Sequence, residues 1–160
     1  MSDKTDHRPP RSAEGEKATL VEFLDYLRRA MVSNLEGAPE PQVRTAGVPS
    51  GTSVLGLVKH LSYVERFYFL GEDVSDWSTT FRPTPEDTVE SVLNSYRDAV
   101  SRANEIIDAC EDLEKPAPYS ARPGSAPTMR WILVHMIEET GRHAGHADIL
   151  REQIDGATGR

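Results

Sequence analysis

The residues best suited to chemistry in this 160-residue chain lie close together near its C-terminal end. They are three histidines and a glutamate within one run: His135, Glu139, His143 and His146. Successive residues of an α-helix lie about 100° apart around its axis, which places these side chains on one stripe. Apolar residues continue the stripe at both ends: Ile132, Met136, Ala147, Leu150 and Ile154. A buried polar cluster is costly unless it is paired or bound, so the pattern favours a metal site.

Imidazole and carboxylate groups suit divalent transition metals. Residues four apart lie one above the other on a helix, so Glu139 and His143 can supply two ligands from one face. The pair His135 and Glu139 has the same spacing and is an alternative. His60 is the only other histidine within an expected helix and is the candidate third ligand. Two histidines and a glutamate would leave coordination positions open, as in catalytic rather than structural zinc sites.

A second interpretation without a metal fits the same residues. A single histidine on the apolar face of a helix, such as His60, is more often a core or boundary residue. A glutamate followed four residues later by a histidine is more often a surface pair. The position of the polar residues at the centre of an apolar stripe favours the metal, but spacing alone leaves both interpretations open.

Four amphipathic segments would carry these residues. Apolar side chains recurring every three or four positions predict helices over about 18–36, 53–70, 85–113 and 127–154. Thr52 or Ser53 can cap the second helix. Thr84 and Pro85 form a start signal for the third, and Gly156 is placed to end the fourth. No segment alternates in the manner of a strand, so the predicted fold is an all-α four-helix bundle.

Composition narrows the classes of function. The net charge of -8 argues against a nucleic-acid or anionic-membrane surface, because phosphate binding needs a basic face. The single cysteine, Cys110, excludes an intramolecular disulfide and a cysteine-rich zinc site, and is expected as a small core residue.

Residues 1–16 are charged and proline-rich, so we expect a flexible tail, with His7 outside the site. They lack the apolar segment of a signal peptide, and no run in the chain is long enough to span a membrane. We therefore expect one bundle domain over residues 17–156 of a cytoplasmic protein.

Two segments carry a family resemblance. They are GLVKHLSYVERF at 56–67 and WILVHMIEETGRHAGHAD at 131–148. Both resemble the DinB/YfiT-like superfamily, in particular its mini-circle branch of uncharacterised proteins. The resemblance runs from about residue 16 to the C-terminus. It implies a four-helix bundle, frequently dimeric, in which one histidine of the second helix and two residues of the last helix hold a divalent metal.

The resemblance also selects among the candidate residues. His60 takes the second-helix position, and the last-helix pattern, often His-x-x-x-His-Arg-Gly-Gln, falls on residues 139–146. Glu139 stands in place of the first histidine, as in the related mycothiol-dependent maleylpyruvate isomerases, and His143 takes the closing histidine. His60, Glu139 and His143 are thus the expected metal ligands. His146, at the glutamine position, and His135 become candidate catalytic neighbours that orient groups or carry protons.

The function implied is that of a metal-dependent S-transferase or isomerase using a low-molecular-weight thiol such as mycothiol or bacillithiol. Zinc is the first expectation for the metal, with nickel, iron or manganese as alternatives, and it would stabilise the thiolate that attacks a small electrophile. A small-molecule substrate and a homodimer are expected, with no nucleic-acid or membrane partner. The alternative is a non-catalytic dimeric module of the stress or resistance type that binds a metal or small ligand.

Overall fold

Four long helices form the bundle in the computed structural model, which describes residues 8–11, 13–122 and 124–159. They are α1 (Glu16–Leu35), α2 (Val54–Leu70), α4 (Val89–Ala109) and α5 (Met129–Asp155). The 3-10 turn η1 (Gln42–Arg44) follows α1, and the short helix α3 (Trp77–Thr80) follows α2. No strand occurs among the described residues, where Pro116 and Thr128 form an isolated bridge. The all-α prediction is confirmed.

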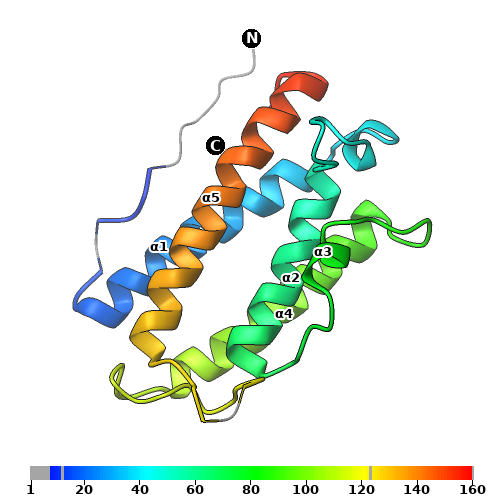
Figure 1. The fold of residues 1–160 in the computed structure, drawn as a ribbon. Helices are drawn as coiled ribbons and strands as arrows, with labels where there is room; N and C mark the ends of the chain where they lie inside the picture. Colours follow the sequence, from blue (N-terminus) through cyan, green and yellow to red (C-terminus); the bar gives the residue numbers. More distant parts are fainter. Residues whose placement is uncertain (1–7, 12, 123, 160) are drawn as a thin grey trace.

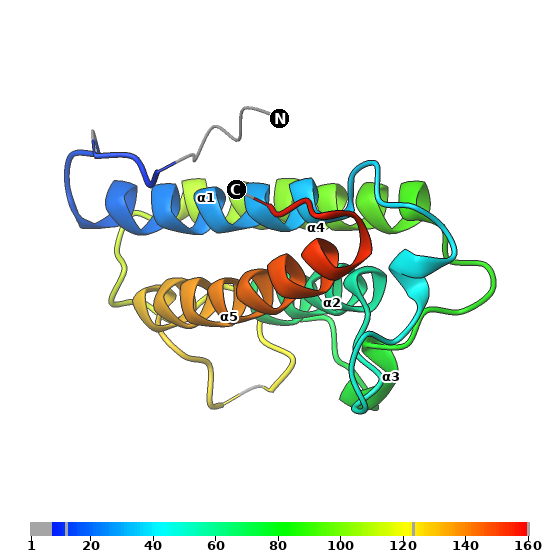
Figure 2. The ribbon, with the colours of Figure 1, turned by 90° about the horizontal axis from the view of Figure 1, so that it is seen from above.

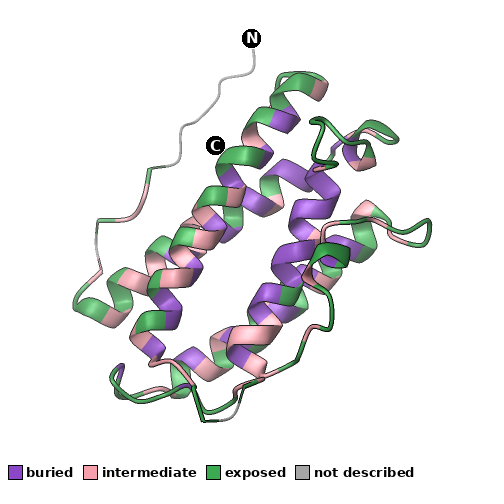
Figure 3. Ribbon diagram, viewed as in Figure 1, coloured by how far each residue is buried: buried purple, intermediate pink, exposed green. Residues whose placement is uncertain are grey.

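The long helices lie in two layers. Helices α2 and α5 form one layer and α1 and α4 the other (Figures 1 and 2). Buried residues line the interior between the layers (Figure 3), and apolar side chains from all four long helices make one core. Cys110 packs half-buried against that core, at the end of α4. None of the described helices is long and apolar enough to cross a bilayer.

Two of the predicted helix ends are confirmed. Ser53 caps α2, because its side chain accepts a hydrogen bond from the N–H of Gly56 at 3.1 Å. Gly156 ends α5 in the left-handed conformation, with φ of 77°, which a residue without a side chain adopts at little cost. Residues 1–7 of the predicted tail, including His7, lie outside the described residues.

The predicted start of the third helix is wrong. Helix α4 begins at Val89, and its cap is Thr88, which exchanges hydrogen bonds with Ser91 in a capping box. Residues 84–87 form a turn instead, in which the Asp87 carboxylate accepts the N–H of Thr84 at 2.6 Å. Asp87 therefore closes the turn before the helix.

Two further boundaries and one short helix differ from the prediction. Helix α5 is capped by Thr128 rather than opened by Pro127. Helix α4 ends at Ala109, about a turn earlier than expected. The short helix α3 occupies a segment in which no helix was predicted.

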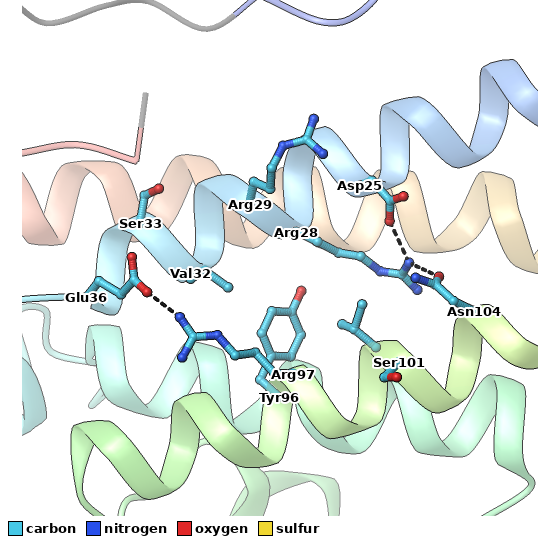
Figure 4. A pocket seen from close by; sticks show the side chains of 11 residues that line it. Asp25, Arg28, Arg29, Val32, Ser33, Glu36, Tyr96, Arg97, Ser101 and Asn104 are labelled. Carbon is cyan, nitrogen blue, oxygen red and sulfur yellow. Dashed lines mark hydrogen bonds and ion pairs between the residues drawn. The ribbon is translucent and has the colours of Figure 1, made fainter. Parts of the chain in front are cut away.

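A buried ion pair ties three of the long helices together. Arg28 of α1 donates two hydrogen bonds to the Glu65 carboxylate of α2, both at 2.7 Å. A further nitrogen of Arg28 reaches Asp25 and the side-chain oxygen of Asn104 on α4 (Figure 4). This network lies beside a cavity of about 580 Å³ between α1 and α4, and burial raises the pKa of the neighbouring Tyr96. The fixed network sets the position of α2, which carries His60.

Candidate metal centre

The structure brings His60, Glu139 and His143 together where α2 faces α5. Nε2 of His60 lies 3.2 Å from Oε1 of Glu139, and Nε2 of His143 lies 3.1 Å from the same oxygen. The three residues form a group whose ligand atoms all lie within 4.8 Å of one another. Metal–ligand bonds of about 2.0–2.2 Å at tetrahedral angles put ligand atoms about 3.3 Å apart. The spacing of this group, which we call the triad, therefore fits a small divalent ion.

The triad is largely shielded from solvent but retains one accessible side. The side chains of His60, Glu139 and His143 are 6%, 20% and 11% exposed. Shielding strengthens the attraction between charges, because the local dielectric constant is lower than that of water. The exposed edge at Glu139 provides a direction from which a small molecule can approach.

Charge states at the triad favour a cation. The neighbouring imidazoles of His143 and His60 outweigh burial and hold the pKa of Glu139 far below its usual range. Burial is the main influence on His60 and lowers its pKa, although Glu139 opposes this. Near neutral pH the triad therefore holds a carboxylate and at least one neutral imidazole, which is the protonation state that metal binding requires.

Residues around α3 surround His60. The Phe81 ring stacks on the imidazole with centroids 3.7 Å apart, and Trp77 meets it edge-on at 5.9 Å. The buried hydroxyl of Thr80 lies 2.7 Å from Nδ1 of His60. Sequence reasoning missed Thr80. The one local signal is Asp76, whose side chain caps α3 by accepting the N–H of Ser78.

His135 and His146 lie on opposite sides of the triad along α5. His135 is half-buried, stacks on Trp131 with centroids 4.9 Å apart, and forms with Glu138 and Glu139 a second group that could hold a metal. His146 is exposed, and its ring centre lies 5.9 Å from that of His143. His135 is thus shielded by aromatic packing, whereas His146 faces solvent.

A pocket of about 260 Å³ lies farther along the same two helices, near the start of α5. Its walls include Phe67, Tyr68, Tyr119, Arg122 and Trp131. Tyr68 follows His60 by eight residues and Trp131 precedes Glu139 by eight, which is about 12 Å along each helix. Burial raises the pKa of Tyr68, and the charge of Glu139 raises it further.

Comparison with known proteins identifies the family. The family model described as mycothiol S-transferase matches residues 19–156, a span that includes every member of the triad and the whole pocket. A search of curated proteins gave no match. The family match confirms the superfamily resemblance predicted from residues 56–67 and 131–148. The chain belongs to the mycothiol S-transferase family, within the DinB/YfiT-like superfamily.

Proposed function

We propose that the protein is a metal-dependent S-transferase in which His60, Glu139 and His143 hold a divalent metal that activates a low-molecular-weight thiol. The family match supports the transfer of a thiol such as mycothiol. The chemistry of the three converging side chains supports the metal. Zinc fits a set of two imidazoles and one carboxylate with positions left open, and nickel, iron and manganese are the alternatives.

The observation that carries the proposal is the pair of Thr80 contacts that decides which nitrogen of His60 carries the proton. The Thr80 hydroxyl donates its hydrogen to the Trp77 carbonyl at 2.7 Å. The contact of 2.7 Å between Thr80 and Nδ1 of His60 therefore takes its proton from the imidazole. In neutral His60 the lone pair then lies on Nε2, which faces a carboxylate oxygen of Glu139 at 3.2 Å. Two electron-rich atoms in this arrangement need a cation, and burial disfavours a second proton on His60.

We infer the reaction as follows. A bound metal lowers the pKa of a coordinated thiol, so the nucleophile is present as thiolate near neutral pH. The thiolate sulfur bonds to an electrophilic carbon, and the leaving group departs with the electron pair of the broken bond. His135 would accept the thiol proton, and its half-buried position between the pocket and Glu139 supports this role. His146, which is exposed, would exchange protons with solvent.

The pocket lined by Tyr68 and Trp131 would bind the part of a substrate that does not react. Aromatic faces offer apolar contact to such a group, and Arg122, which lies over the Phe67 ring at 5.8 Å, offers hydrogen-bond donors. We further propose that the enzyme acts in the cytoplasm as a homodimer, as the family resemblance implies.

Trp131→Ala should raise KM for the substrate held in the pocket about 2–12-fold, because one aromatic contact contributes about 0.5–1.5 kcal/mol. Steady-state kinetics with thiol and electrophile varied in turn would show which of them the pocket binds. The matched control is Val134→Ala on the same helix, since Val134 is 52% exposed and does not line the pocket. A KM unchanged for both substrates would exclude this binding position.

Removal of the metal should destabilise the protein. At a free metal concentration 100 times Kd, binding contributes about 2.7 kcal/mol to stability. For a chain of this length, 1 kcal/mol corresponds to about 2–4 °C in Tm, so a strong chelator should lower Tm by about 5–10 °C. Thermal melts with and without chelator, followed by restoration with zinc, test this. A Tm that stays the same would indicate that the histidines are structural.

The decisive test measures both the metal content and the thiol consumption of the same proteins. Elemental analysis of the purified protein should find a stoichiometric divalent metal, and the loaded protein should consume mycothiol in the presence of a panel of electrophiles. Both results should disappear in His60→Ala and His143→Ala. Metal bound without thiol consumption would favour the non-catalytic binding module, and an unchanged metal content in the variants would exclude the triad as the site.

A further inference from the structure

The segment 76–87, here called the strap, is fixed against one face of α2. Its first residue caps α3, which contacts α2 (Figure 1). Beyond α3, Lys59 donates to the Arg82 carbonyl at 3.0 Å and to the Asp87 carboxylate at 2.8 Å. Lys59 directly precedes His60, so the strap is bound to α2 beside the imidazole as well as through α3.

Gly56 allows the strap to lie this close. It precedes His60 by four residues and therefore lies one turn before it on the same face of α2. A Cβ at Gly56 would collide with the backbone carbonyl oxygen of Phe81. The absence of a side chain at this position lets the Phe81 backbone rest on α2, which places the Phe81 ring over His60 and the Thr80 hydroxyl at its Nδ1.

The hydrogen-bond direction at Thr80 is set by the strap itself. Thr80 is 2% exposed, and its hydroxyl donates within α3 to the carbonyl of Trp77. The Thr80 oxygen can then only accept a hydrogen bond from Nδ1–H of His60, so Nε2 of the neutral imidazole carries no proton. The opposite tautomer would put a proton on the atom that faces Glu139. His143 differs, since its Nδ1 is buried with no hydrogen-bond partner among the described residues.

We propose that the strap is a positioning device for His60, in which Thr80 selects the tautomer that can bind a metal and Phe81 and Gly56 fix the ring. Thr80 acts through His60 and is a positioning residue, not a catalytic one. The inference rests on the proposed metal site. An orienting hydrogen bond to a ligand histidine typically changes metal affinity about 10–100-fold.

The test compares Thr80→Val, which keeps the shape and loses the hydroxyl, with Thr80→Ser, which keeps the hydroxyl. Competition between each protein and a chromophoric chelator for zinc should show affinity lowered about 10–100-fold in Thr80→Val and close to wild type in Thr80→Ser. Nitrogen-15 NMR of the metal-free proteins, at a pH where His60 is neutral, should show Nδ1–H in wild type and Thr80→Ser, and loss of that preference in Thr80→Val.

A second variant tests the contact between the strap and Gly56. Gly56→Ala should displace the Phe81 backbone and lower zinc affinity, whereas Gly145→Ala should leave it unchanged, because a Cβ there meets nothing within 4 Å. Equal loss in Thr80→Val and Thr80→Ser, or a proton on Nε2 in the wild type, would overturn the proposal. Wild-type protein that binds no zinc yet shows the Nδ1–H tautomer would refute the metal site and leave the positioning of His60 intact.

Discussion

Glu65→Ala is expected to lower the free energy of unfolding by about 3–5 kcal/mol, the usual effect of leaving one charge of a buried pair alone. Glu65 is fully buried and Arg28 is 3% exposed, so water cannot replace the lost carboxylate. Burial acts to lower the pKa of Arg28, but the attraction of Glu65 outweighs it and holds the guanidinium charged. Urea denaturation followed by circular dichroism measures the difference.

The control for Glu65→Ala is Glu72→Ala, which removes a carboxylate from an exposed pair. Glu72 and its partner Arg102 are 48% and 47% exposed, and such pairs contribute about 0–1 kcal/mol. An apolar replacement of both members, Arg28→Met with Glu65→Leu, should recover most of the lost stability, because the cost arises from the unpaired charge. If Glu65→Ala costs no more than Glu72→Ala, water must reach Arg28 and the pair is not a buried one.

The number and type of the long helices and the cap of α2 could be predicted from the sequence, but the first residue of α4 could not. The chain offers two start signals before α4, at Thr84 and at Thr88. The choice between them depends on Asp87, which is held by tertiary contacts. Lys59 binds its carboxylate at 2.8 Å and Arg44 binds its carbonyl at 2.7 Å. Both contacts come from residues distant in the sequence, so local propensity could not decide between the two caps.

The candidate site, too, could be predicted only in part from the sequence. The helical stripe put the polar residues of α5 into one group, but a helical wheel does not tell which of them faces α2. Packing makes the distinction, since His143 lies beside Glu139 and His60 while His146, three residues later, is exposed. The cap at Asp76 indicates α3 but not the role of Thr80, because that role arises only where the strap crosses α2. The orientation of a ligand is a tertiary property, even where the ligand type can be read from the chain.

His143→Ala is expected to lower zinc affinity by more than about 100-fold, because losing a ligand must exceed the effect of losing a group that merely orients one. Glu139→Gln should have a comparable effect, since the amide keeps the shape of the side chain but removes the charge that the low pKa of Glu139 preserves. Competition titration with a chromophoric chelator measures both affinities, and circular dichroism confirms that the helices persist.

Two matched variants make the triad result specific. Glu152→Gln changes an exposed acid on the same helix and should leave zinc affinity as in wild type. His135→Ala separates the two ligand sets that helical spacing allows, because His135, Glu138 and Glu139 form the other group with suitable spacing. Retained zinc in His135→Ala with loss in His143→Ala would assign the metal to the triad. The reverse result would move it one turn along α5, away from His60 and the strap, and a thiol bound there would approach from the side of Tyr68 and Trp131.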